Sequence, residues 1–237
     1  LVWLISGQLD ADSLNGLVKI RRQNGKTLYE NREALSVGFL VSPEIVDWDP
    51  SAGSGMDAEN SFVRLACGFP ELFSQSEYFI GRSDVTYKLP IPEGSLCCVL
   101  LDTTPNKIDW TTPEFKRVYG KYTRFLLEAA ATGPDQYAAL KVTTGGEKYT
   151  GRAWICSRED YRKVIGALGE SQLTGVTAAG NRLGGSIDAK RDGILLLTVP
   201  FDPGWEIRVD GEKAEAVKIG GALTGVQPGG IPVEERR

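Results

Sequence analysis

The stretch LVKIRRQNGKTLY, at residues 17–29, decides the fold class. Apolar, strand-forming residues lie on both sides of Asn24 and Gly25, and such a pair favours a tight hairpin because both turn positions need a positive φ. Another apolar segment follows at residues 35–41. The stretch therefore predicts short strands, two of them joined by a two-residue turn, as is typical of a β-rich protein.

Short strand-like segments recur along the rest of the chain. In residues 205–209 apolar and charged side chains alternate, so we expect one face of that strand to be buried and the other to be solvated. Asp210 and Gly211 then close a hairpin. We expect further strands at residues 78–80, 85–89, 96–101, 121–131, 182–189, 193–199 and 217–226.

Two segments predict helices. The first begins at Asp57, which can cap the free amides of the first turn, and ends near Gly68. Its expected anchors are Phe62, Val63 and Leu65. The second covers residues 157–168, where Ser157 with Asp160 resembles a capping box and the apolar residues follow the helical repeat.

Together these patterns predict a mainly β fold with a minor α+β component, made of antiparallel, β-sandwich-like sheets with two short helices. A polar, turn-rich segment at residues 103–113 is the expected boundary between two parts. Residues 1–112 would form an N-terminal β-rich region and residues 113–237 a C-terminal β-sandwich-like domain with one helix. A chain of 237 residues also fits a single domain.

Composition narrows the function classes. The net charge is -4, so no basic field exists to neutralise phosphates, and we expect neither nucleic acid nor an anionic membrane surface as a partner. No apolar run is long enough to cross a bilayer. The chain begins at Leu1 without an initiating methionine, so we expect a piece of a longer protein.

The chain contains no histidine, which excludes Ser-His-Asp and Cys-His catalysis because both need an imidazole base. Its four cysteines are Cys67, Cys97, Cys98 and Cys156. Buried free thiols explain them best, and up to two disulfides stay open as the alternative. We predict no metal site and no cofactor.

Aromatic residues in polar loops are the first candidates for ligand contacts. Trp48 and Trp110 lie in segments predicted as loops, where a ring can stack on a sugar or simply pack on the protein. Trp205 alternates with apolar residues and favours the core. Asp47 and Asp49 match the Asp-x-Asp pattern that binds a divalent ion in nucleotide-sugar transferases, but solvated loop carboxylates explain them better.

Two blocks of the sequence resemble the YfhO family of bacterial membrane proteins. Tyr-Glu-Asn from Tyr29 and Ala-Leu-Ser-Val-Gly-Phe from Ala34 begin the first block, which continues through residues 47–50. The second block covers residues 180–187 and 193–205 and ends with Val-Asp-Gly at 209–211. Departures from the family pattern are Phe201, Ser36 and the tail at residues 228–232.

The resemblance implies a parent protein with many membrane helices, similar to GT-C-type glycosyltransferases that use lipid-linked sugars to decorate cell-wall polymers such as lipoteichoic acid. This chain would be its accessory or recognition module on the extracytoplasmic face of the cell membrane. Its partners would be the parent's own membrane helices and cell-wall polysaccharide or teichoic acid.

No catalytic residue can be assigned to this chain on that basis. The candidate carbohydrate-binding residues are Trp48, Trp110, Asp47, Asp49, Asp202 and Trp205. Two alternatives stay open. One is a free-standing carbohydrate-active hydrolase of the cell envelope, whose paired carboxylates need no fixed spacing in the sequence. The other is a purely structural brace of the membrane domain.

Overall fold

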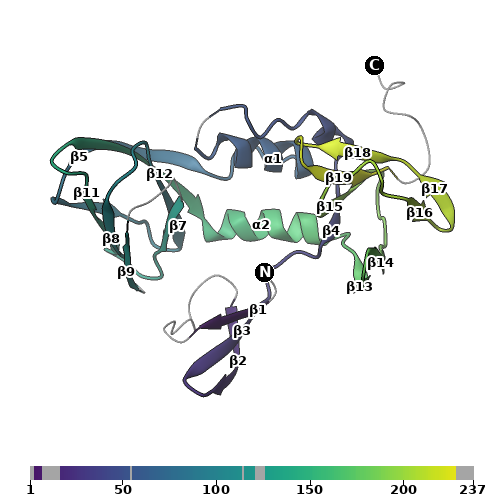
Figure 1. Cartoon of the computed structure of the whole chain (residues 1–237), viewed down its shortest axis with the longest axis horizontal. Helices are drawn as coiled ribbons and strands as arrows, with labels where there is room; N and C mark the ends of the chain where they lie inside the picture. Colours follow the sequence, from purple (N-terminus) through teal and green to yellow (C-terminus); the bar gives the residue numbers. More distant parts are fainter. Residues whose placement is uncertain (1–2, 7–16, 54, 114, 121–125, 228–237) are drawn as a thin grey trace. The chain divides into compact units, whose positions relative to one another are not determined.

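A computed structural model describes residues 3–6, 17–53, 55–113, 115–120 and 126–227, which form mainly antiparallel strands (Figure 1). The helical elements are α1 at Asp57–Cys67, α2 at Arg158–Gly169 and a short 3₁₀ helix, η1, at Pro43–Asp47. The predicted mainly β fold with two short helices is confirmed. In these described parts, no helix is long and apolar enough to cross a bilayer.

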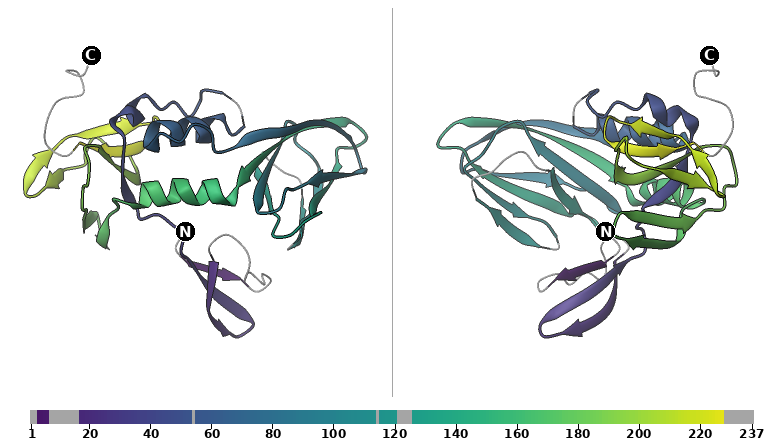
Figure 2. Two further views of the ribbon diagram at one scale, coloured as in Figure 1. Left: turned by 180° about the vertical axis from the view of Figure 1, so that it is seen from behind. Right: turned by 45° about the vertical axis from the view of Figure 1, so that its right-hand side comes forward.

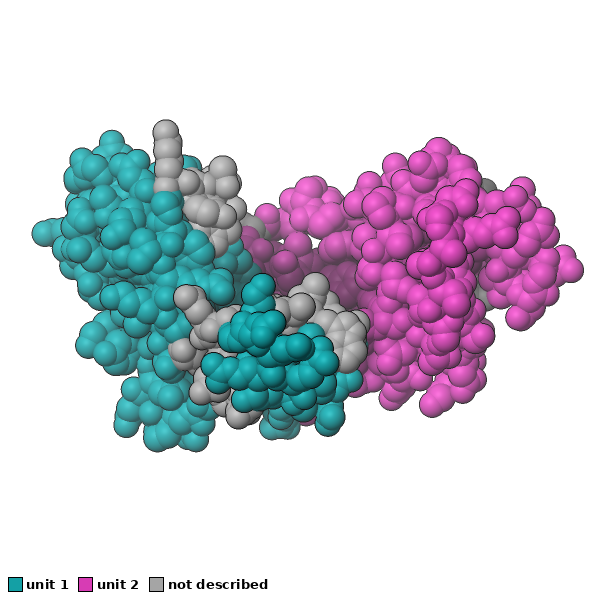
Figure 3. All heavy atoms as spheres, turned by 60° about the horizontal axis from the view of Figure 1, so that its bottom comes forward, with its two compact units in different colours: residues 1–34, 72–162 teal, residues 35–71, 163–237 magenta. Residues whose placement is uncertain are grey.

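The chain forms two compact units, and each combines two separate stretches of sequence (Figure 3). Unit 1 comprises residues 1–34 and 72–162, and unit 2 comprises residues 35–71 and 163–237. The boundary predicted between residues 112 and 113 lies inside unit 1. Neither unit is therefore a single continuous segment of the sequence.

Unit 1 begins with a three-stranded sheet in the order β1-β3-β2, from β1 at Trp3–Ser6, β2 at Leu17–Gln23 and β3 at Lys26–Asn31. The turn between β2 and β3 holds Asn24 at φ 51° and Gly25 at φ 72°. The hairpin predicted at this Asn-Gly pair is thus confirmed, together with the positive φ values that favour these two residues there.

The larger part of unit 1 is a sandwich of two four-stranded antiparallel sheets (Figure 2). One has the order β10-β7-β12-β5 and the other the order β6-β11-β8-β9. Their strands are β5 at Ser74–Arg82, β6 at Thr86–Pro90, β7 at Ser95–Leu101, β8 at Lys107–Thr111, β9 at Lys116–Tyr119, β10 at Leu126–Ala130, β11 at Tyr137–Thr143 and β12 at Lys148–Ser157.

Alternate residues of these strands fill the space between the two sheets. In β8 the inward residues Ile108 and Trp110 are buried, and in β11 Ala138, Leu140 and Val142 are fully buried. All five belong to one apolar cluster with residues of the facing sheet. The period-2 burial means that the other side chains of both strands point away from this core.

Two local predictions differ from the structure, and a third is described only in part. Trp110 does not lie in a loop but in strand β8. Asp57 is not the N-cap residue of α1, because Met56 occupies that position and Asp57 is the first helical residue. The strand expected at residues 121–131 is described only from Leu126, since residues 121–125 lie outside the described part of the chain.

The start of α2 follows the prediction. The hydroxyl of Ser157 accepts a hydrogen bond from the backbone N–H of Asp160 at 3.0 Å and donates one to its carboxylate at 2.8 Å. Both contacts satisfy polar groups at the helix start, as a capping box does. Further along the helix, Val164 and Leu168 are buried.

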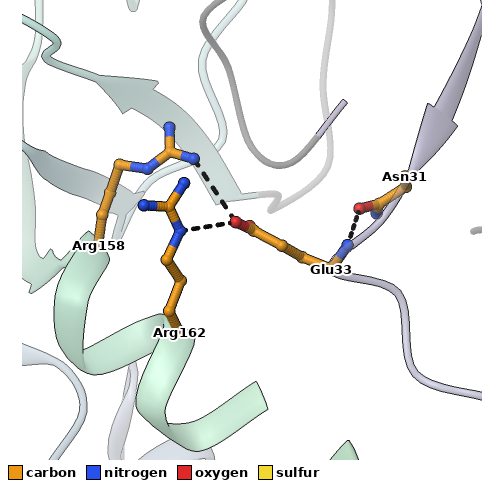
Figure 4. A network of polar contacts seen from close by, with 4 residues as sticks. All are labelled: Asn31, Glu33, Arg158 and Arg162. Atoms are coloured by element: carbon orange, nitrogen blue, oxygen red, sulfur yellow. Dashed lines mark hydrogen bonds and ion pairs between the residues drawn. The ribbon is translucent and has the colours of Figure 1, made fainter. Parts of the chain in front are cut away.

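A carboxylate from the N-terminal part of unit 1 meets this helix (Figure 4). Glu33 lies 2.8 Å from Nε of Arg162 and 3.9 Å from a terminal nitrogen of Arg158. Its own backbone N–H donates to the side-chain oxygen of Asn31 at 3.0 Å. The segment after β3 is therefore fixed to α2 by charge-assisted contacts, which are the stronger class of hydrogen bond.

Unit 2 is built on a four-stranded sheet in the order β18-β19-β15-β4. Its strands are β4 at Gly38–Val41, β15 at Ile194–Pro200, β18 at Ala216–Ile219 and β19 at Leu223–Val226. Two hairpins accompany it, one of β13 at Thr174–Ala179 with β14 at Arg182–Ser186, and one of β16 at Ile207–Val209 with β17 at Glu212–Ala214. All residues of β4 are buried, so this strand is central to the core of the unit.

The four cysteines are free thiols, and three of them are buried. Burial raises the pKa of Cys97 to about 12 and that of Cys156 to about 11, because a thiolate loses its hydration in the protein interior. The preferred prediction of buried free thiols is confirmed for these residues. Cys67 is only partly buried, and burial raises its pKa as well.

Candidate functional site

A groove of about 950 Å³ opens within unit 2. Strands β14, β15, β16 and β19 and the turn between β15 and β16 contribute to its walls. Two of the predicted candidates, Asp202 and Trp205, line it together. Its lining residues are Asn181, Arg182, Leu183, Leu197, Val199, Asp202, Gly204, Trp205, Glu206, Ile207, Arg208 and Thr224.

The turn at one wall holds Trp205 in place. The carboxylate of Asp202 accepts a hydrogen bond from the N–H of Gly204 at 2.7 Å, and its carbonyl accepts one from the N–H of Trp205 at 3.1 Å. Pro203 between them restricts its own φ, so little backbone freedom is left in this turn. Asp202 therefore stabilises this turn, and the turn positions Trp205.

The indole of Trp205 is anchored and still accessible. Its Nε1 donates a hydrogen bond to the carbonyl of Pro200 at 3.1 Å, yet the residue is 37% exposed. The prediction that Trp205 favours the core is therefore wrong. An aromatic ring that is fixed by its polar atom and open to solvent can stack on a ligand without a large loss of side-chain entropy.

The groove carries charges of both signs. Arg208 is paired with Glu206 at 2.7 Å and also donates to the carbonyl of Gly211 at 3.2 Å, so both side chains of that pair are committed to the β16–β17 hairpin. Arg182, on β14, has no ion-pair partner among the residues that the structure describes. Its guanidinium is therefore available for a ligand.

A buried threonine fixes the floor of the groove. Thr224 is 1% exposed, and its hydroxyl lies 3.2 Å from the carbonyl of Val199 and 3.1 Å from that of Pro200. It therefore holds β19 against the end of β15, where the regular strand register is interrupted. The carbonyl of Pro200 also accepts the hydrogen bond from Nε1 of Trp205. One backbone carbonyl therefore binds both Thr224 and Trp205.

Trp48 lies elsewhere in unit 2 and has a packing role. Its ring meets Phe62 edge to face with centroids 5.1 Å apart, and its Nε1 donates to the carbonyl of Ala58 at 3.0 Å. Gly220 approaches the ring so closely that a Cβ atom there would overlap it. The ring thus fixes η1 against α1 and does not line the groove.

The two carboxylates beside Trp48 are exposed. Asp49 accepts hydrogen bonds from the N–H and the hydroxyl of Ser51 at 2.8 and 2.7 Å, and these bonds hold its pKa below the usual value. Asp47 ends the 3₁₀ helix η1. Within the described residues, no group of three His, Cys, Asp or Glu side chains could hold a metal ion.

Trp110 is not available to a ligand in this structure. Its side chain is fully buried in the core of the unit 1 sandwich, and its Nε1 donates to the carbonyl of Glu128 at 3.0 Å. Of the six predicted candidates, the structure therefore brings together Asp202 and Trp205 and leaves Trp48, Asp47, Asp49 and Trp110 outside the groove.

Sequence reasoning did not select Arg182 and Asn181 as ligand contacts. They follow Gly180, whose φ of 60° shapes the turn of the β13–β14 hairpin. The signal that could have found them is their position in the same family-like block as the Asp202–Trp205 turn. No local pattern shows that this hairpin lies beside that turn.

A comparison with protein families gives one match. The family model described as "Bacterial membrane protein YfhO" matches residues 104–228, which is more than half of the chain. These residues include the whole groove of unit 2. No curated protein matches the chain.

Two solved structures share a distant likeness. The capsular polysaccharide assembling protein CapF from Staphylococcus aureus is 6% identical with a TM-score of 0.27, covering 43% of this chain and only 36% of CapF. A cupin 2 domain-containing protein from Halorhodospira halophila is 9% identical with a TM-score of 0.26, covering 64% of this chain and 89% of that protein. These scores are too low to support a conclusion about fold or function.

Proposed function

The chain belongs to the YfhO family of bacterial membrane proteins, and we propose that it is the extracytoplasmic carbohydrate-recognition module of its parent protein. In this proposal the parent is a glycosyltransferase that acts on a cell-wall polymer or a lipid-linked sugar. Its own membrane helices are the module's structural partner, and cell-wall polysaccharide or teichoic acid is its ligand. The module itself supplies binding and no catalytic group.

The groove beside Trp205 is the observation that carries the proposal. Sugars are bound by aromatic rings that cover their apolar face and by polar side chains that hydrogen-bond their hydroxyl groups. The groove offers a fixed and exposed indole, an amide in Asn181 and the guanidinium of Arg182. Leu183 and Ile207 add apolar surface between these polar groups. This mixture fits a hydroxyl-rich ligand better than a purely apolar one.

The residues of the same groove support the alternative of a carbohydrate-active hydrolase less well. Glycoside hydrolysis needs two carboxyl groups that are free to act on the substrate. Asp202 and Glu206 both line the groove, but Asp202 holds the turn before Trp205 and Glu206 holds Arg208. Both are committed to the local structure, so we do not adopt the hydrolase as a second candidate.

The test is a titration of the 237-residue chain with teichoic-acid fragments and simple sugars, followed by tryptophan fluorescence and calorimetry. We expect a saturable fluorescence shift in the wild-type chain. Trp205→Phe should lose most of the shift but keep calorimetric binding, because the phenyl ring still stacks. Trp205→Ala should weaken binding about tenfold, which is the scale of one aromatic contact.

Arg182→Gln should also weaken binding, whereas Arg208→Gln should have a smaller effect because Arg208 is already paired with Glu206. Circular dichroism of each variant distinguishes lost binding from lost folding. If no ligand in the panel shifts the fluorescence or releases heat, recognition is refuted and the structural brace becomes the better account of the module.

A further inference from the structure

One face of the unit 1 sandwich carries an excess of positive charge. The outward side chains of the sheet β6-β11-β8-β9 include Lys88, Lys141, Lys107 and Lys116, one from each strand. We call these four residues and the surface between them the lysine face. Three of the four lysines are exposed, and Lys141 is half-buried.

Strand register spreads the four lysines across the whole sheet. Lys88 lies opposite Ala139 of β11, Ala139 lies opposite Thr111 of β8, and Thr111 lies opposite Lys116 of β9. The next rows place Lys141 beside Asp109 and Lys107 beside Thr143. In the row from Lys88 to Lys116, only Ala139 and Thr111 lie between the two lysines, so the lysines are the longest side chains of that row.

The positive charge is only partly compensated. Lys107 is paired with Asp109 at 3.0 Å, and Asp84 borders the face through a hydrogen bond from Thr143 at 2.8 Å. Hydrogen bonds from Thr143 and Ser83, and then the charges of Lys141 and Lys107, lower the pKa of Asp84. Four lysines against two aspartates leave the face positive, whereas the whole chain has a net charge of -4.

Exposed apolar side chains accompany these charges. Tyr137, at the start of β11, is 45% exposed, and Val118, on β9, is 57% exposed. The ammonium group of Lys88 lies 4.4 Å from the centre of the Tyr137 ring. Tyrosine beside lysine is the combination that suits the boundary between lipid headgroups and acyl chains, where the ring enters and the ammonium stays with the phosphates.

We propose that the lysine face docks on the anionic surface of a phospholipid bilayer. Charge complementarity supports this occupant, and the chain belongs to a family of bacterial membrane proteins, so its parent lies in a bilayer. The proposal concerns unit 1 and is independent of the ligand groove in unit 2. Whole-chain charge argued against such a partner, but a single sheet face does not share the charge of the whole chain.

The test measures binding of the 237-residue chain to sucrose-loaded vesicles that are sedimented by centrifugation. Vesicles of equal parts phosphatidylglycerol and phosphatidylcholine are compared with vesicles of phosphatidylcholine alone. We expect binding only to the anionic vesicles, with loss in 0.5 M NaCl because salt screens exposed charges. Lys88→Gln combined with Lys116→Gln should weaken binding about 25-fold, at about fivefold for each lysine near an anionic membrane.

The matched control is Lys190→Gln combined with Lys213→Gln, which changes the net charge equally at exposed positions of unit 2. It should bind like the wild-type chain. Tyr137→Ser should weaken binding while leaving its salt dependence unchanged. Equal losses in both lysine pairs, or no binding to anionic vesicles, would overturn the proposal. Equally tight binding to soluble polyphosphate would also overturn it, by making the partner a free polyanion instead of a bilayer.

Discussion

The carboxylate of Glu33 accepts a hydrogen bond from Nε of Arg162 at 2.8 Å, although the two residues are 129 positions apart in the sequence. The Glu33 side chain is only 16% exposed and Arg158 also faces it. This contact joins the segment after the N-terminal hairpin to the first turns of α2. It links the two separate stretches of sequence that make up unit 1.

Replacement of Glu33 by Gln should lower the free energy of unfolding by about 1–3 kcal/mol, since Arg158 and Arg162 lose a shared negative charge on a carboxylate that is only 16% exposed. Urea unfolding followed by circular dichroism measures the change. Glu30→Gln is the matched control, because Glu30 pairs with Arg32 at the surface and should contribute less than about 0.5 kcal/mol. Equal effects of the two substitutions would contradict a special role for Glu33.

Two glycines should respond in opposite directions to the same added methyl group. A Cβ atom at Gly81 would overlap the buried ring of Tyr149, so Gly81→Ala should lower the free energy of unfolding by about 1–3 kcal/mol through overpacking. Gly166 lies in α2, and apart from its chain neighbours and the adjacent helix backbone nothing lies within 4 Å of its added Cβ. Gly166→Ala should therefore stabilise the chain by about 0.5–1 kcal/mol, as helix propensity predicts. Thermal unfolding of the two variants checks both signs.

Thiol chemistry should distinguish the four cysteines. At pH 8 a thiol with a pKa of about 12, as for Cys97, is ionised in only about one molecule in ten thousand. Cys67 is the most accessible of the four, so a disulfide-exchange reagent should label it first in the native chain. Cys67→Ser should remove this fast phase. Labelling of Cys97 or Cys156 at a similar rate would be inconsistent with their burial.

The same burial predicts a pH dependence of stability. The pKa of Cys97 is higher in the folded chain than the ordinary value of 9.0, so its contribution is complete below about pH 9 and is lost as the pH rises toward 12. The free energy of unfolding should fall over this range. In Cys97→Ala, which has no thiol to ionise, the fall should be smaller, as urea unfolding at pH 8 and pH 10.5 would show.

Substitution of Trp48 should affect mainly stability, whereas substitution of Trp205 should affect mainly ligand binding. Trp48→Ala removes a ring that packs on Phe62 and holds α1 through its Nε1, so it should cost about 2–4 kcal/mol of unfolding free energy. Trp205→Ala should cost less than about 1 kcal/mol and should affect the groove instead. Urea unfolding and sugar titration of both variants provide the comparison. A large loss of stability in Trp205→Ala alone would reverse these roles.

Sequence patterns predicted the elements that depend on neighbouring residues. The Asn24-Gly25 turn needs only its own positive φ values, and α2 is specified by Ser157, Asp160 and an apolar repeat. Such signals act over a few residues, so they are readable in one sequence. The resemblance to the YfhO family was also correct: the family match at residues 104–228 includes the second block, whereas the first block, at residues 29–50, lies outside the matched residues.

Features that depend on distant contacts could not be predicted in this way. Trp110 stands among polar residues and turn formers, yet it is buried because strands from elsewhere in unit 1 cover it. Trp205 alternates with Ile207 and Val209 as a core residue would, but the hydrogen bond to Pro200 holds it at the groove. The neighbourhood of Arg182 and Trp205 depends on tertiary packing that no local spacing encodes.

Strand β4 has a consequence for the synthesis of the protein. Its residues Phe39, Leu40 and Val41 are buried against β15, which the ribosome completes only after residue 200. At typical elongation rates of 5–20 residues per second, β4 waits roughly ten to thirty seconds for its partner. The intervening sandwich strands emerge in the meantime and can pair first. During this interval β4 is an unpaired, apolar strand on the nascent chain. Such a segment is a binding site for a holding chaperone.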